Sequence, residues 1–306
     1  MQDGIFSNLH PATKLLFSIF MIIITFIAFF IGGMLIAMFF FHISLSDIQS
    51  ISSGFDNIPF LKYLQTLQAI SLFIIPSIII AYFFNRKWYN YLSLDKGTNI
   101  FSIAIVVLIV FISLPFINFL AEINSKLNLP AFLDGIEQWM KNSEKEATVL
   151  TEKFLTVNTL SGLLFNIFMI GILPAIGEEF LFRGILQKIF TDWTKNVHAG
   201  IIISAFIFSA FHLQFYGFLP RMLLGMMFGY FLVWSGSMWL PVIAHFVNNT
   251  MAVITYYFVT KGNLNQEVEK IGSENNTYIY AIISFISVSL LLFYLYKYEK
   301  KLNLNL

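Results

Sequence analysis

Apolar residues fill most of this chain in long runs, which short polar stretches separate. Several runs approach or exceed the roughly 20 residues that an α-helix needs to cross the hydrocarbon core of a bilayer. We expect eight such helices, over approximately residues 15–41, 61–84, 100–120, 162–190, 197–214, 222–234, 239–258 and 278–296. The pattern therefore predicts an all-α polytopic membrane protein with about eight transmembrane helices.

The composition agrees with this prediction and excludes other classes of protein. Hydrophobic residues make up 58% of the 306 positions and charged residues only 11%, far from the usage of soluble domains. The formal net charge of +1 and the lack of a lysine and arginine cluster give no reason to expect a nucleic-acid partner. The chain has no cysteine, so disulfides and thiolate metal sites are excluded.

The predicted helices divide the chain into two parts. Residues 1–160 hold the first three helices and a long polar segment, and residues 161–306 hold the other five helices. In the polar segment, residues 122–160, apolar residues recur at near-helical spacing among Glu and Lys, which favours an amphipathic helix on the membrane surface. A substrate lid is the alternative, and nothing in the residues selects it. Eight crossings put both termini on one side, and the Lys and Arg positions favour the cytoplasmic face, which we expect to be that of a bacterial membrane.

Two adjacent acids and an arginine lie within the fourth predicted helix: Glu178, Glu179 and Arg183. Charged groups at that depth cost several kcal/mol each and usually face a cavity or a partner. On an α-helix, Glu179 and Arg183 are about 40° apart and can pair, whereas Glu178 points about 100° away from Glu179. We expect Glu179 and Arg183 to play a supporting, structural role as a pair. Glu178 must then find its partner on another helix.

Three more polar residues interrupt the later apolar runs. His212 ends the stretch Phe208-Ser209-Ala210-Phe211-His212 on the fifth predicted helix, and His245 and Asn249 lie four residues apart, on one face of the seventh. A lone histidine or asparagine in a membrane bundle is most often a packing hydrogen bond. Because these three occur together with an unpaired Glu178, we expect the four side chains to converge on one hydrated pocket.

Such a set of side chains could hydrolyse an amide without a Ser or Cys nucleophile. A buried carboxylate, Glu178, together with His212, would activate water, and His245 with Asn249 would donate hydrogen bonds to the developing oxyanion. This reading requires no cofactor. In the alternative, zinc is bound by Glu178, His212 and His245, a ligand count that suits a catalytic site. A third reading is a proton-coupled carrier with Glu178 as the relay.

The order of these residues resembles that of a known family, the CPBP (Abi) intramembrane proteases. The family includes type II CAAX prenyl endopeptidases and bacteriocin-processing or self-immunity proteins. The resemblance covers residues 162–259, and it implies an eight-helix bundle in which four helices form the catalytic core around the site. It also implies the roles given above for the four polar residues, with zinc as the alternative. Its three motifs stand here as Glu178-Glu179-x-x-x-Arg183, Phe208-x-x-x-His212 and His245-x-x-x-Asn249.

We therefore expect an intramembrane endopeptidase, whose partners are the lipid bilayer and a membrane-associated peptide or protein, prenylated or bacteriocin-like. A non-catalytic immunity or scaffold protein of the same fold is the main alternative. The sequence does not identify the substrate.

Overall fold

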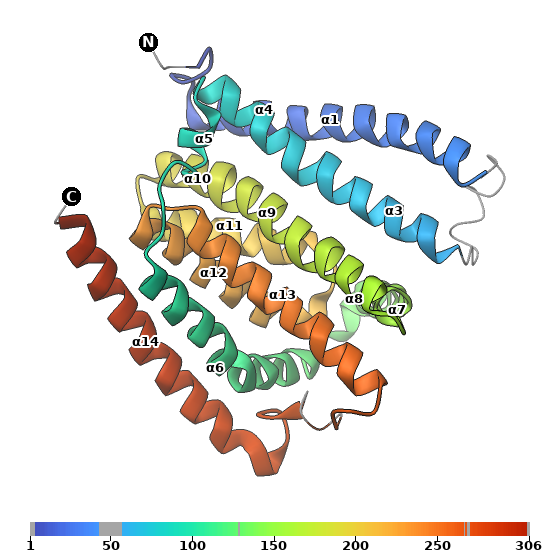
Figure 1. Cartoon of the computed structure of the whole chain (residues 1–306). Coiled ribbons are helices and arrows are strands. Elements are labelled where there is room, and N and C mark those ends of the chain that lie inside the picture. The colour runs from blue at the N-terminus through green and yellow to red at the C-terminus, as the bar shows by residue number, and fades with distance from the viewer. Residues whose placement is uncertain (1–3, 43–56, 128, 266, 268–269, 305–306) are drawn as a thin grey trace.

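The computed structural model describes residues 4–42, 57–127, 129–265, 267 and 270–304, and these residues form a bundle of helices without a β-sheet (Figure 1). The first half of the chain contains α1 (Pro11–Phe40), α3 (Ile58–Ala69), α4 (Ile75–Phe84), α5 (Trp88–Tyr91), α6 (Ile100–Ser125) and α7 (Asp134–Leu155). The second half contains α8 (Leu160–Asn166), α9 (Leu173–Glu179), α10 (Gln187–Thr194), α11 (Val197–Phe211), α12 (Phe218–Ser235), α13 (Trp239–Thr260) and α14 (Tyr278–Leu304). Three π-helical stretches, Ile70–Ile74, Ile167–Ile172 and Phe180–Leu186, connect neighbouring α-helices into longer continuous rods, and short 3₁₀ turns lie at Ala131–Leu133, Phe215–Gly217 and Asn275–Thr277.

The predicted membrane crossings agree with these helices. Seven helices in the described residues are long and apolar enough to cross a bilayer, and each overlaps one of the predicted runs. The remaining predicted crossing is α11, an apolar helix of 15 residues that is too short to span by itself. The prediction of an all-α polytopic membrane protein is therefore confirmed.

Two prolines lie just inside α-helices that follow a π-helical stretch. Pro76 comes after Ile70–Ile74, and Pro174 comes after Ile167–Ile172. A proline ring inside a helix clashes with the carbonyl four residues earlier, and the wider π turn moves that carbonyl away. The second crossing therefore runs through Pro76 without a break, from Ile58 to Phe84.

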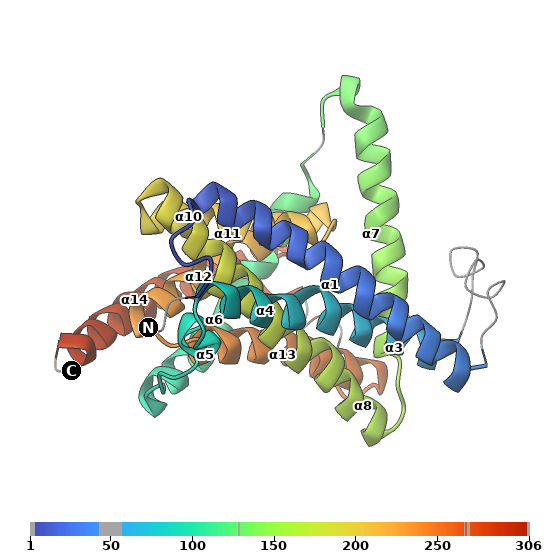
Figure 2. The same ribbon diagram turned by 90° about the horizontal axis from the view of Figure 1, so that it is seen from above.

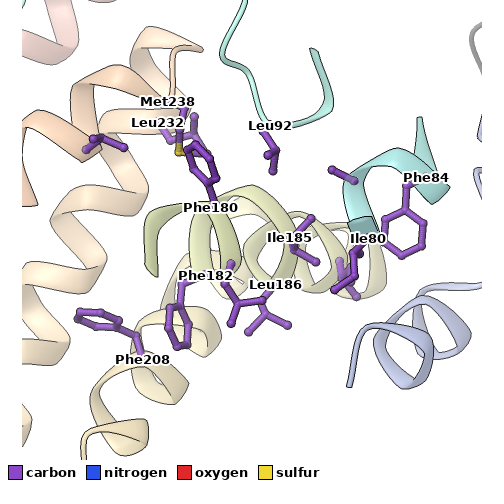
Figure 3. Packing of buried hydrophobic residues seen from close by; sticks show 14 of the residues in the cluster. Ile80, Phe84, Leu92, Phe180, Phe182, Ile185, Leu186, Phe208, Leu232 and Met238 are labelled. Carbon is purple, nitrogen blue, oxygen red and sulfur yellow. The ribbon is translucent and has the colours of Figure 1, made fainter. Parts of the chain in front are cut away.

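The largest group of buried apolar side chains surrounds the π-helical stretch that follows the acid pair (Figure 3). Phe180 points toward Met238 at the start of α13. Phe182 points the other way and meets the ring of Phe208 with 5.2 Å between centroids. Ile80 of α4 is fully buried in the same group, so the helices of residues 1–160 and those of residues 161–306 share one core. The division into two parts remains a prediction.

Helix α7 runs across the direction of the other long helices. It is seen end-on beside α8 in Figure 1 and along its length in Figure 2. Its C-terminal end is fixed by a chain of hydrogen bonds, in which Asn166 Nδ2 donates to Phe154 O at 2.8 Å and Lys62 Nζ donates to Asn166 Oδ1 at 2.7 Å. Most of its apolar side chains, including Ile136 and Trp139, are exposed, as suits the predicted helix on a membrane surface.

Candidate functional site

A cavity of about 580 Å³ lies between α3, α7, α9, α11, α12 and α13. All four residues that the sequence singled out as catalytic line it: Glu178, His212, His245 and Asn249. The two predicted supporting residues, Glu179 and Arg183, are fully buried beside the cavity and do not line it. The fold thus brings side chains from α9, from the C-terminal end of α11 and from α13 to one place.

Glu178 is at the centre of the polar part of this cavity, and its side chain is 12% exposed. Its Oε2 atom lies 3.8 Å from Nε2 of His245 and 4.0 Å from Nε2 of His212. The same oxygen is buried and has no hydrogen-bond partner in the described part of the chain. Separations of this size are too long for direct hydrogen bonds but fit a water molecule that bonds to both atoms.

The other ring nitrogen of each histidine has a fixed partner. Nδ1 of His212 lies 2.8 Å from the carbonyl oxygen of Phe208, which can only accept a hydrogen bond, so Nδ1 must carry a proton. Nδ1 of His245 lies 2.8 Å from Oε1 of Glu179, and a carboxylate there likewise accepts. In the neutral form of both rings, Nε2 is therefore an unprotonated acceptor that points toward Glu178.

These contacts refine the role that we expected for His245. A neutral His245 with its proton on Nδ1 has no hydrogen to offer to an oxyanion, so it can donate through Nε2 only as an imidazolium. Neutral His245, neutral His212 and ionised Glu178 together present three acceptors to the cavity. A water molecule can donate a hydrogen to two of these acceptors, and a shared proton can lie between two of them.

Glu179 and Arg183 form the predicted ion pair, and both side chains also contact residues on other helices. Nη1 of Arg183 lies 2.9 Å from Oε1 of Glu179, an ion pair without good hydrogen-bond geometry, and Nη2 donates to the carbonyl oxygen of Gly225 at 3.1 Å. The guanidinium also lies over the rings of Phe208, at 4.4 Å, and Phe228, at 5.5 Å. Oε1 of Glu179 therefore serves both the arginine on its own helix and His245 on α13.

The two phenylalanines hold the histidines as well as the arginine. The ring of Phe208 meets that of His212 edge-on at 5.0 Å, and the ring of Phe228 stacks on that of His245 at 5.3 Å. This arrangement gives a physical reason for Phe208 in the second motif, because one ring packs on both Arg183 and His212.

Asn249 lines the cavity one turn beyond His245 on the same face of α13. Its Nδ2 atom donates to the carbonyl oxygen of Ile170 at 3.0 Å, and its Oδ1 atom accepts from Asn248 at 3.2 Å. An amide nitrogen has two hydrogens, so the second remains for a group in the cavity. Asn248, which precedes it in the chain, also lines the cavity.

The carboxylate of Glu178 and the imidazoles of His212 and His245 are chemically suitable zinc ligands, but the distances between their donor atoms are not suitable. Four-coordinate zinc with bonds of about 2.0–2.1 Å holds its ligand atoms about 3.3–3.4 Å apart. The Nε2 atoms of His245 and His212 are 3.8 and 4.0 Å from Oε2 of Glu178. Within the described residues, no group of three or more His, Asp or Glu side chains could hold a metal ion. The residues as arranged therefore do not fit the zinc alternative.

Sequence reasoning missed Arg221 and Gln214, which both line the cavity. Arg221 is part of α12, whereas the corresponding predicted helix, 222–234, begins one residue after it. The signal in the sequence that could have indicated Arg221 was its position as a cation directly before the apolar run 222–234. Helix α7 lies in the polar segment for which the sequence predicted an amphipathic helix, and its Leu150 and Phe154 form part of the cavity wall, a position that the sequence did not reveal.

The fold and this cavity define a class: an integral membrane protein with acids and imidazoles gathered in a polar chamber between its spanning helices. Residues 160–251 match the family described as type II CAAX prenyl endopeptidase Rce1-like. For this segment, the match confirms the resemblance to the CPBP (Abi) membrane proteases that the three motifs indicated.

The comparison with curated proteins finds a relative in Bacillus subtilis strain 168, the uncharacterized protein YpbD, which is 29% identical over 86 residues. The similar region covers 27% of this chain and 41% of the relative, so the chain spans about two fifths of that protein. No solved structure matches this chain.

Proposed function

We propose that this protein is an intramembrane endopeptidase that hydrolyses a peptide bond with water activated by Glu178 and His212. The observation that carries the proposal is the buried Oε2 atom of Glu178, which lacks a partner and lies within a water's reach of two imidazole nitrogens. The match of residues 160–251 to a family of prenyl endopeptidases supports the same reaction class.

The steps of the reaction follow from which of these side chains can accept a proton and which can donate one. Water in the cavity donates one hydrogen to Oε2 of Glu178 and the other to Nε2 of His212, and its oxygen attacks the substrate carbonyl carbon. Glu178 takes the proton as the C–O bond forms, and the carbonyl oxygen becomes an oxyanion. The free hydrogen of the Asn249 amide and, when protonated, Nε2 of His245 stabilise that charge. Glu178 then delivers its proton to the leaving amine as the C–N bond breaks.

The substrate in this proposal is a peptide or protein held at the bilayer, because the cavity lies among spanning helices and has an apolar wall as well as the polar one. A prenylated peptide fits the printed description of the matching family, and a bacteriocin-like peptide is the other candidate. We propose further that the protein resides in a bacterial cytoplasmic membrane with both termini in the cytoplasm, a topology that requires α11 and its flanking residues to complete an eighth crossing. Water, bound without a metal ion, is the proposed nucleophile.

A comparison of membrane peptides tests this function directly. Cells carry the wild-type protein, Glu178→Gln, or Glu122→Gln, an exposed acid that pairs with Lys126 and lies outside the cavity. Mass spectrometry of membranes then records which peptides accumulate uncut. We expect uncut peptides with Glu178→Gln only, and these peptides would identify the substrate. Identical peptide profiles for the wild type and Glu178→Gln, with the cellular phenotype retained, would instead indicate the non-catalytic scaffold or immunity protein.

A further inference from the structure

A peptide that enters the cavity displaces water from it, so its backbone N–H and C=O groups need new hydrogen-bond partners. A backbone group that is left without a partner among membrane helices costs several kcal/mol. The reaction centre supplies partners for the carbonyl that is attacked and for no other part of the backbone. The cavity must therefore offer further donors and acceptors beside the bond that is cut.

Asn248 brings a side-chain amide to the cavity wall beside the reaction centre. It comes three residues after His245 on α13, so the two side chains project from the same face of the helix. Its Nδ2 atom donates to Oδ1 of Asn249 at 3.2 Å, the only hydrogen bond of this side chain within the described residues. A primary amide has two N–H groups and one oxygen, so one N–H and Oδ1 of Asn248 remain for a bound peptide.

Helix α3 supplies two more amides to the same cavity, those of Gln65 and Gln68. The two residues are three positions apart on one face of the helix, and both line the cavity. In the described part of the chain, neither side chain makes a hydrogen bond. Each therefore presents a free acceptor and free donors, in a wall that is otherwise largely apolar.

These amides come from opposite sides of the helical rod that carries Glu178. The rod consists of α8, α9 and the π-helical stretch between them, and it lies between α3 and α13 and packs against both (Figure 1). Packed helices lie about 8–10 Å apart, so α3 and α13 are separated by at most about 16–20 Å. An extended peptide at about 3.3 Å per residue covers this distance in about five or six residues.

We propose that the substrate crosses this rod as an extended strand, with Asn248 bound to its backbone on one side of the scissile bond and Gln65 and Gln68 bound to it on the other. This inference rests on the proposed function and adds residues that position the substrate. The N–H and C=O of one residue in an extended strand point to the same side, so a single side-chain amide can bond to both. These contacts involve no substrate side chain, so they select an extended backbone rather than a particular sequence.

The test replaces single backbone N–H groups of a substrate by ester oxygens. Short peptides of randomised sequence, prenylated and unprenylated, are first incubated with full-length protein in liposomes, and mass spectrometry identifies a cleaved peptide and its cleaved bond. This parent peptide is then made with one ester at each position near the cleaved bond, which itself stays an amide. The initial cleavage rates of the parent and of each ester peptide are compared.

The variants remove the proposed contacts with side chains of similar size. They are Asn248→Leu and the double variant Gln65→Met with Gln68→Met, and Glu178→Gln gives the background. The matched controls are Asn142→Leu and Gln138→Met, because both residues are exposed on α7 and lie outside the cavity.

We expect wild type and both controls to cleave the parent about 2- to 10-fold faster than a peptide with an ester at a contacted position, the range for one neutral hydrogen bond. Asn248→Leu should lose this preference at a position on one side of the cleaved bond. The double glutamine variant should lose it on the other side. Since the ratio of parent to ester is measured within one variant, a variant that folds only in part still reports it.

Three results would count against the proposal in distinguishable ways. Equal cleavage of the parent and of every ester peptide by the wild type overturns the backbone contacts and leaves the peptidase in place. Variants that slow the parent and the ester peptides by the same factor give these amides a structural role only. No cleavage of any peptide above the Glu178→Gln background removes the proposed function itself, and the backbone contacts with it.

Discussion

Nε2 of His212 and Oε2 of Glu178 face each other across 4.0 Å, from the end of α11 and from α9. The distance leaves room for one water molecule, and the carbonyl of Phe208 fixes the histidine proton on the far nitrogen. The near nitrogen is therefore an acceptor, as a base requires. The position of the histidine depends on its far nitrogen and its basicity on the near one, so the two can be tested separately.

Replacing His212 by asparagine should remove activity and leave the fold intact. The asparagine amide can still donate to the carbonyl of Phe208, but it has no basic nitrogen that reaches toward Glu178. We expect cleavage to fall by about 10²–10⁴-fold, the range for a lost acid–base group, with a change in unfolding free energy within about 1 kcal/mol. His198→Asn is the matched control, because His198 lies outside the cavity and contacts Tyr230. Cleavage by His212→Asn at the wild-type rate would contradict the proposed role.

Removal of metal ions should leave activity unchanged. The separations of 3.8 and 4.0 Å between the histidine nitrogens and Oε2 of Glu178 are wider than four-coordinate zinc allows. The measurement is the cleavage rate before and after dialysis against a chelator, together with the zinc content of the purified protein. Loss of activity that zinc restores, at one ion per chain, would show that the three side chains close around a metal ion.

The substitutions Glu178→Gln and Glu179→Gln should affect different properties. Glu179→Gln leaves the buried guanidinium of Arg183 without its carboxylate, and removing one member of a buried ion pair typically costs about 3–5 kcal/mol. Glu178 has no such partner, so Glu178→Gln should reduce activity and leave thermal stability in detergent nearly unchanged. Unfolding temperatures measured for both variants decide this. An equal decrease in the unfolding temperature of both variants would mean that Glu178 also stabilises the fold.

Gly200→Ala should destabilise the contact between α10 and α11. A Cβ atom at Gly200 would lie 2.8 Å from the backbone nitrogen of Thr191 and 2.9 Å from the backbone oxygen of Gln187, neither of which can turn away. Overpacking of this kind costs about 1–3 kcal/mol. Gly32→Ala is the matched control, because a Cβ there meets no atom within 4 Å. The two variants should therefore differ clearly in thermal unfolding, and equal stability would contradict the close contact.

Much of the site could be predicted from local spacing. The i, i+4 rule gave the contact between Glu179 and Arg183, and the shared helix face of His245 and Asn249 put both on the cavity wall. The presence of polar residues in apolar runs indicated that these side chains would converge. Each of these inferences needed only the geometry of a single helix or the cost of burying a polar group.

The rest depended on how the helices are arranged in space. The hydrogen bond from His245 to Glu179 joins two residues that are 66 positions apart in the sequence and lie on different helices, so no periodicity could reveal it. The π-helical stretches change the angular spacing on both sides of Glu179, which a uniform 100° step does not include. The position of Arg221 in the cavity wall depends on how α12 packs against the other helices, which the sequence alone does not show.

One oxygen atom, Oε1 of Glu179, holds two cationic or proton-donating groups at once: the guanidinium of Arg183 and the imidazole of His245. The effects of substitutions at these three positions should therefore not sum, and a double-mutant cycle between Arg183 and His245 should show coupling although they are on different helices. A substitution at one of these three positions should therefore persist in evolution only together with a substitution at another. Among related sequences, residues of the first motif should covary with His245 of the third.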